Sequence, residues 1–153
     1  MPKDKEWLDN LLKQADELEE QRVKTPIDVE VILAEELVTV RLTYQRRDDF
    51  ERIASKHPIV NLTDTRGAWF NLDGVAKDYP DVVLIDGDGT DELYELRGKE
   101  AVYRWPDVYE ALRETDRQSV QAAIWGVYVW EPQQALKNAK AKTLAREKEA
   151  ADA

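Results

Sequence analysis

The sequence predicts an α+β fold in which a β-hairpin packs against several helices, preceded by an amphipathic helix and followed by a charged tail. Two patterns of apolar residues support this prediction: the spacing is helical over residues 4–22, and it alternates as in a strand over residues 27–44. A length of 153 residues suits one well-filled core better than two. We therefore divide the chain into a helical arm of residues 1–25, a single domain of residues 26–132 and an Ala/Lys/Glu-rich tail of residues 133–153.

The first predicted helix, residues 4–22, has one apolar face. Its other face carries Asp, Glu, Lys and Gln side chains, as is typical of a helix at a protein surface. The apolar face consists of Trp7, Leu8, Leu11, Leu12, Ala15 and Leu18. Such a face packs either on its own domain or on a neighbouring subunit, and the sequence is compatible with both.

Residues 27–44 predict a β-hairpin. Apolar and polar residues alternate from Ile27 to Ile32 and again from Val38 to Tyr44, with residues 34–36 as the connection. A lone hairpin is only marginally stable in water. Its apolar face must therefore be covered by a helix of this chain, or the hairpin must be extended by strands of another subunit.

Two short helices are expected next. Residues 46–56 repeat at helical spacing and end before Pro58, because the residue before a proline disfavours helical geometry. The second short helix is capped by Asn71 or Asp73 and reaches Tyr79.

The last third of the chain predicts two more helices. The first begins at Trp105, with Pro106 in its first turn. Residues 115–118 match a capping box, so the second helix is expected to begin there, and Pro132 is expected to end it. Residues 133–153 hold few large apolar side chains and predict a solvated helix or a disordered tail.

Composition limits the classes of function. A net charge of -10 argues against a nucleic-acid-binding protein, because neutralising phosphates requires clustered Lys and Arg. The chain has no cysteine, which removes disulfides and thiolate sites and suits a reducing cytoplasm. The first residues lack the apolar run of a signal peptide, and no stretch has membrane-spanning length. We therefore expect a cytoplasmic protein that binds neither nucleic acid nor membranes.

Residues 82–90 combine a short apolar run, assigned as a buried strand, with alternating Asp and Gly. They resemble the first motif of the haloacid dehalogenase superfamily of phosphatases, which implies that Asp86 is a nucleophile and Asp88 a general acid, with magnesium as cofactor. That family needs several later βα units, whereas the pattern after Thr90 is mostly helical. A solvated Asp-Gly turn is therefore the preferred interpretation.

Other chemistry finds little support. The same acidic stretch lacks two key residues of a calcium loop, since Asp91 replaces the glycine and Arg97 replaces the final glutamate. The single histidine, His57, has no nearby catalytic constellation and is assigned as a structural turn residue. We expect no catalytic, cofactor-binding or metal-binding residues, and therefore a protein that acts by binding other proteins.

Large aromatic residues gather in the last third of the chain. They are Trp105, Tyr109, Trp125, Tyr128 and Trp130. Aromatics of this size dominate both cores and interface hot spots, and both interpretations stay open. Trp130, next to the tail, is expected to be the most exposed.

Several features, taken in order, resemble the tail assembly chaperones of long-tailed bacteriophages, especially those of actinobacteria. The resemblance runs from about Ile27 to Tyr128. It rests on Val38, Val40, Arg41 and Leu42, on Phe50 and Ile53 before His57-Pro58, on Phe70 before Asn71 and Asp73, and on Trp105 and Trp125.

The resemblance implies a protein of the host cytoplasm, absent from the mature virion, that keeps the tape measure protein soluble and helps to recruit tail tube protein. Self-association is also expected. The residues assigned to partner binding are Leu8, Leu11, Leu12, Trp125 and Trp130. The alternatives are a phage head-to-tail connector or other virion component, and a phosphatase using Asp86 and Asp88.

Overall fold

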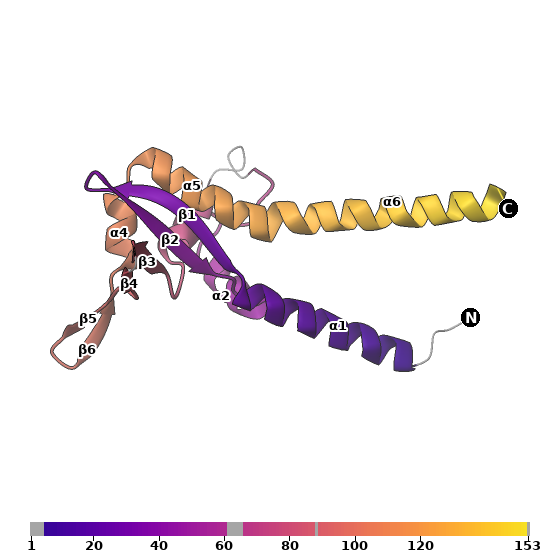
Figure 1. Cartoon of the computed structure of the whole chain (residues 1–153), viewed down its shortest axis with the longest axis horizontal. Helices are drawn as coiled ribbons and strands as arrows, with labels where there is room; N and C mark the ends of the chain where they lie inside the picture. The colour runs from indigo at the N-terminus through magenta and orange to yellow at the C-terminus, as the bar shows by residue number, and fades with distance from the viewer. Residues whose placement is uncertain (1–4, 61–65, 88, 153) are drawn as a thin grey trace.

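The computed structural model describes residues 5–60, 66–87 and 89–152. It confirms the predicted α+β class: a small domain carries two long helices that project from one side (Figure 1). The elements in chain order are α1 (Lys5–Lys24), β1 (Pro26–Leu33), β2 (Glu36–Thr43), α2 (Arg47–Ser55), α3 (Leu72–Lys77), β3 (Val83–Asp86), β4 (Gly89–Asp91), β5 (Tyr94–Arg97), β6 (Glu100–Tyr103), α4 (Trp105–Ala111), α5 (Glu114–Trp125), the π-helical segment η2 (Gly126–Trp130) and α6 (Glu131–Asp152).

The predicted hairpin is present as β1 and β2, paired antiparallel. Its connection is shorter than expected, because Leu33 pairs with Glu36 and only Ala34 and Glu35 remain in the turn. Both turn residues have positive φ, 51° and 68°. A two-residue type I′ turn requires this, and its twist matches that of the two strands. The strands alternate as predicted, and Val31, Val40 and Leu42 point into the core.

The hairpin is extended by strands of its own chain. The sheet order is β1-β2-β3-β4, with β3 antiparallel to β2 through pairs such as Arg41 and Val83. Residues 82–85 were predicted as a buried strand. Strand β3 begins one residue later, at Val83, and its apolar residues are half-buried, whereas Val82, just before it, is fully buried. Strand β4 and the separate β5–β6 hairpin were not predicted; the hairpin extends away from the body of the domain (Figure 1).

The core lies between the sheet and the shorter helices. Trp105 at the start of α4 is fully buried, and its indole N–H donates to the carbonyl of Ala76 in α3, at 2.8 Å. Helix α3 begins at the predicted cap, since the side chain of Asn71 accepts from the amide of Gly74 at 3.4 Å. It ends at Lys77, two residues earlier than expected.

Two predictions about the last helices are wrong. Helix α5 begins at Glu114, so Thr115 lies inside the helix and the capping box is not formed. The carboxylate of Asp116 accepts locally from Arg113 at 3.0 Å and, in a tertiary contact, from the amide of Ile32 at 3.4 Å.

The helix does not end at Pro132 but continues through η2 into α6. The amide of Glu131 donates to the carbonyl of Gly126, five residues back. Such a π turn changes the hydrogen-bond pattern directly before Pro132, so the helix accommodates a residue that has no N–H. Of the two predictions for the tail, the helix is therefore correct over residues 131–152.

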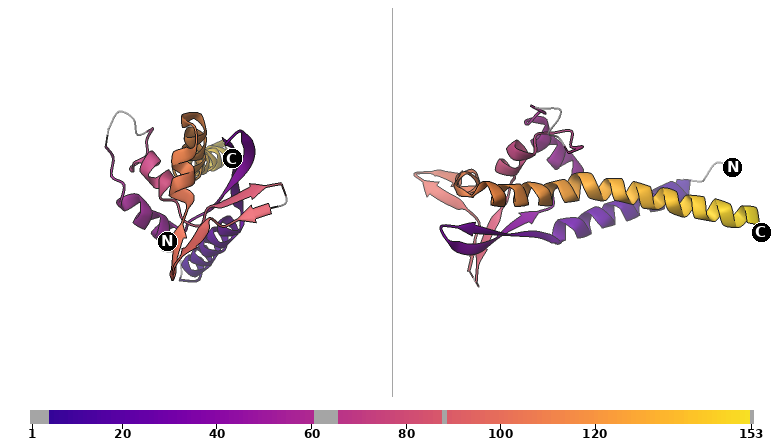
Figure 2. Two further views of the ribbon diagram at one scale, coloured as in Figure 1. Left: turned by 90° about the vertical axis from the view of Figure 1, so that its left-hand side faces the viewer. Right: turned by 90° about the horizontal axis from the view of Figure 1, so that it is seen from above.

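Helices α1 and α6 extend beyond the domain in the same general direction (Figures 1 and 2). They run in opposite chain directions, with their roots at the domain and their free ends away from it. None of the residues Lys5–Lys24 or Glu131–Asp152 is buried. The apolar face of α1 thus does not pack on its own domain, which was one of the two alternatives.

Candidate partner-binding surface on the projecting helices

Helix α1 exposes the large apolar side chains that its sequence places on one face. We call Trp7, Leu8, Leu11, Leu12 and Leu18 the α1 stripe; Leu12 is 61% exposed and Leu18 is 62% exposed. Leu8, Leu11, Ala15 and Leu18 follow the 3-4-3 spacing of a coiled-coil seam. A contiguous apolar stripe on a projecting helix is typical of a protein interaction site.

The root of α1 is held by contacts between polar and aromatic side chains. The Tyr44 hydroxyl donates to Glu19 at 3.1 Å, and the Arg22 guanidinium lies 4.9 Å from the centre of the Tyr44 ring. Arg22 also forms an ion pair with Glu131 at the root of α6. Burial and the neighbouring Glu19 carboxylate raise the pKa of Tyr44, so its hydroxyl stays protonated as a donor.

A second set of ionic contacts lies on the same helix. Arg46, in the loop before α2, contacts Asp16 at 3.4 Å and Glu20 at 3.8 Å. Asp16 and Glu20 lie on the polar side of α1, and Leu18, the stripe residue nearest the root, is 62% exposed, so these contacts leave the α1 stripe uncovered. This anchor was not predicted, although the acidic run 16–20 and the basic run 46–47 are visible in the sequence.

Helix α6 presents a different surface. Leu136 and Leu144 are exposed, and Leu144 is 65% exposed. Between and beside them stand the basic residues Lys137, Lys140, Lys142 and Arg146, which we call the basic block. At the root, Trp130 is 48% exposed, which matches its expected position.

Trp125 differs from the other residues assigned to partner binding. It is half-buried, packs against the core, and donates its indole N–H to the carbonyl of Arg66 at 2.8 Å. Its ring therefore serves mainly to attach the loop before α3 to α5. Of the assigned residues, the structure places Leu8, Leu11 and Leu12 together on α1, and Trp130 apart from them at the root of α6.

The direction of α6 depends on Tyr128 in η2. Its ring stacks on Phe50, with centroids 3.7 Å apart, and on Tyr44 at 5.3 Å. Its hydroxyl lies 2.7 Å from the Tyr79 hydroxyl and accepts from the amide of Gln45 at 2.7 Å. Burial raises the pKa of Tyr128 to about 12. Tyr128 thus belongs to the core, where the sequence analysis left core and interface open.

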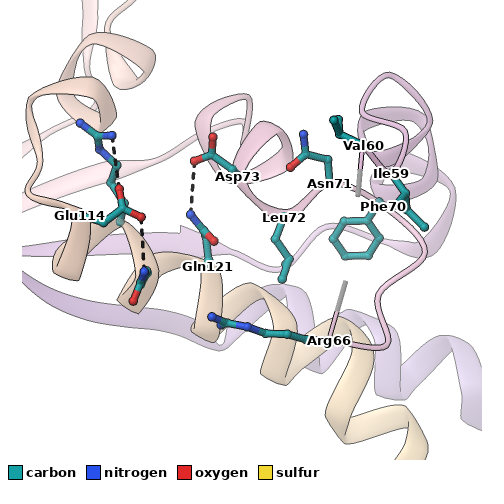
Figure 3. A pocket seen from close by; sticks show the side chains of 11 residues that line it. Ile59, Val60, Arg66, Phe70, Asn71, Leu72, Asp73, Glu114 and Gln121 are labelled. Atoms are coloured by element: carbon teal, nitrogen blue, oxygen red, sulfur yellow. Dashed lines mark hydrogen bonds and ion pairs between the residues drawn. The ribbon is translucent and has the colours of Figure 1, made fainter. Parts of the chain in front are cut away.

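A polar depression of about 300 Å³ lies between α3 and α5 (Figure 3). On its wall, Asp73 accepts from the Tyr109 hydroxyl at 2.6 Å and from Gln121 at 3.3 Å. Glu114 lies 3.7 Å from Arg117 and 3.4 Å from Gln118. Burial and the hydrogen bond to Asp73 raise the pKa of Tyr109. These carboxylates are engaged within the wall, so the geometry favours a structural network over a ligand site.

The Asp-Gly stretch forms a turn between antiparallel strands. Asp86 ends β3 exposed and pairs with Gly89, and Gly87 has a φ of 57°. Asp88 lies outside the described residues. Among the residues that the structure describes, the sheet is antiparallel throughout, unlike the parallel sheet that the phosphatase motif requires. The same part of the chain contains no group of acidic or histidine residues that could hold a metal ion.

His57 has the structural position that its sequence context predicts. Its Nε2 lies 3.0 Å from a carboxylate oxygen of Asp78, and its carbonyl accepts from the amide of Asn71 at 2.9 Å. The ring also packs closely on Gly74 in α3. His57 thus joins the end of α2 to α3.

None of the helices in the described ranges is long and apolar enough to cross a bilayer. The chain matches no protein-family description, no curated protein and no solved structure. The case for a function therefore depends on the geometry of α1 and α6.

Proposed function

We propose that the protein is an assembly chaperone that binds an apolar helix of another protein on α1 and α6. The observation that carries this proposal is the exposure of five large apolar residues on α1 and two on α6, on helices with no buried residue between Lys5 and Lys24 or between Glu131 and Asp152. A partner helix that covers them removes this surface from water, which favours binding.

The magnitudes indicate that both helices take part. Complete burial of an exposed leucine side chain contributes about 1.5–3 kcal/mol. The four leucines of α1 are only 43–62% exposed, so covering the remaining surface contributes about half of that for each, or about 3–6 kcal/mol together. Association of two molecules costs about 4–15 kcal/mol in lost freedom. Because these ranges overlap, α1 alone gives at most weak binding, and stable binding requires Leu136, Leu144 or Trp130 as well.

The partner in this proposal is the tape measure protein of a long-tailed phage, a long hydrophobic helix. This choice comes from the resemblance in the domain, residues 27–128. The chaperone would act in the host cytoplasm, leave before the virion matures and assist the recruitment of tail tube protein. A net charge of -10 supports the role, because it keeps a complex with an apolar helix in solution.

The test is co-expression with the tape measure protein, followed by separation of soluble and insoluble fractions. We expect the tape measure protein to be soluble only together with this chain, and the two to elute as one complex. An insoluble tape measure protein in the presence of the soluble chain would contradict the proposal.

A pair of single substitutions maps the surface. Leu11→Asp places a charge in the α1 stripe and should abolish the complex. Asn10→Asp adds the same charge one position away, outside the stripe, and should leave the complex intact. Equal effects of the two substitutions would show that the α1 stripe is not the binding surface.

A further inference from the structure

Helices α1 and α6 carry opposite charges. Residues 14–21 of α1 contain Asp16, Glu17, Glu19 and Glu20 and no basic residue. Residues 132–146 of α6 contain the four residues of the basic block and no acidic residue. An acidic helix that carries an apolar stripe favours a basic partner helix that also exposes apolar residues, because opposite charges attract. The chain therefore carries, on α6, a surface that complements its own α1.

The two helices of one molecule do not use this complementarity. They are joined at their roots by Arg22 and Glu131, yet no residue of Lys5–Lys24 or Glu131–Asp152 is buried. The basic block begins at Lys137, six residues beyond Glu131, whereas the acidic run ends at Glu20, two residues before Arg22. Within one chain, the acidic run of α1 and the basic block of α6 therefore lie at different distances from the helix roots.

A second copy removes this mismatch. If two molecules approach with their projecting helices interleaved, α1 of each lies along α6 of the other. The helices have 20 and 22 residues, about 30 Å and 33 Å at 1.5 Å per residue, so their lengths match. Because both project in the same general direction, one two-fold axis satisfies both contacts, and the assembly closes as a dimer (Figure 2).

We infer that two copies of this chain form a four-helix bundle in which α1 of each molecule pairs with α6 of the other. The alternative, α1 against α1, places like charges from residues 14–21 together and is disfavoured. The bundle covers the α1 stripe, Leu136 and Leu144 when no other partner is present. This inference does not depend on the proposed function, although a tape measure helix would then compete with the second copy.

The first measurement is the molar mass of the purified full chain by size-exclusion chromatography with light scattering across a dilution series. The expected value at high concentration is twice the chain mass of 17.7 kDa, falling toward 17.7 kDa on dilution. A wild-type chain that stays at 17.7 kDa throughout overturns the inference. If that monomer also solubilises the tape measure protein, the surface belongs to that partner alone, and the proposed function stands.

Charge reversal on each helix tests the pairing. Asp9→Lys with Glu17→Lys changes the net charge of Lys5–Lys24 from -2 to +2, and Lys137→Glu with Lys140→Glu changes that of Glu131–Asp152 from +1 to -3. The structure gives none of these four residues an ion pair within the described ranges. Each double variant alone should be monomeric, because its α1 and the α6 of a second copy then have the same sign. An equimolar mixture of the two should restore the dimer mass.

The mixing experiment contains its own folding control, since a misfolded variant could not restore the dimer. Two results overturn the inference: dimers of either double variant alone as stable as the wild type, or a mixture that stays monomeric while both variants keep the wild-type circular dichroism spectrum.

Discussion

Arg22 and Glu131 form an ion pair that joins the root of α1 to the root of α6 across 109 positions of sequence. Arg22 also lies over the ring of Tyr44, which in turn stacks on Tyr128 in η2. The Arg22 guanidinium of α1 therefore contacts both the root of α6 and Tyr44, the residue after β2. This contact joins the two helix roots, while the stack of Tyr128 on Phe50 and Tyr44 holds the start of α6 on the domain.

Arg22→Gln should loosen α1. The lost ion pair and cation–π contact together contribute about 1 kcal/mol, which corresponds to about fivefold faster opening of the helix root. Amide hydrogen exchange over residues 16–24 measures this change. Lys24→Gln removes the same charge two residues away, where the described residues show no ion pair, and should leave exchange unchanged. Equal exchange in the two variants would show that Arg22 does not hold α1.

Two glycines in helical segments should respond oppositely to alanine. A Cβ at Gly74 would lie 2.5 Å from Nδ1 and 2.9 Å from Cγ of His57, so Gly74→Ala should lower the free energy of unfolding by about 1–3 kcal/mol. A Cβ at Gly126 meets no described atom within 4 Å, so Gly126→Ala should raise it by about 0.5–1 kcal/mol. Urea denaturation measures both values. A stabilised Gly74→Ala variant would mean that His57 moves freely.

Tyr128→Phe should destabilise the domain while preserving the ring stack. The change removes the acceptor of the Gln45 amide and the contact with the Tyr79 hydroxyl, at a cost of about 1–3 kcal/mol. Tyr94→Phe is the control, because Tyr94 is exposed and its hydroxyl has no hydrogen bond to a described residue; it should change stability by less than about 0.5 kcal/mol. Thermal unfolding of both variants provides the comparison.

Asp28 should titrate below its ordinary range. Arg41, its partner across β1 and β2, donates two hydrogen bonds to the carboxylate, at 2.8 Å and 2.9 Å, and lowers the pKa of Asp28. The resulting stabilisation is fully present above the unfolded value of about 3.9 and is lost as pH falls through the lower folded pKa.

Carbon-detected NMR of the Asp28 carboxyl group measures this pKa directly. Arg41→Gln should raise the pKa of Asp28 toward about 3.9, whereas Arg47→Gln, outside the hairpin, should not change it. An identical pKa of Asp28 in the wild type and in Arg41→Gln would contradict the register of β1 and β2, in which these two residues are opposite each other.

Local patterns in the sequence predicted much of the secondary structure. The first helix, the β1–β2 hairpin and the cap at Asn71 are all in place, because spacing and capping are properties of neighbouring residues. The β5–β6 hairpin was missed, although Tyr94 and Leu96 alternate with polar residues before Gly98, whose φ is 64°. The capping box failed because α5 begins at Glu114, one residue before Thr115. The amide of Ile32 donates to Asp116 in the first turn of α5, a contact across 84 positions that local sequence does not show.

The sequence by itself determined that α1 has an apolar face containing Leu8, Leu11 and Leu12, since helical geometry places these residues together. Only the tertiary structure decided that this face is uncovered, that Trp125 is part of the domain and that α6 continues past Pro132. The physical reason is that burial depends on which surfaces meet. Those surfaces are set by contacts such as Arg22 with Glu131, between residues far apart in the chain.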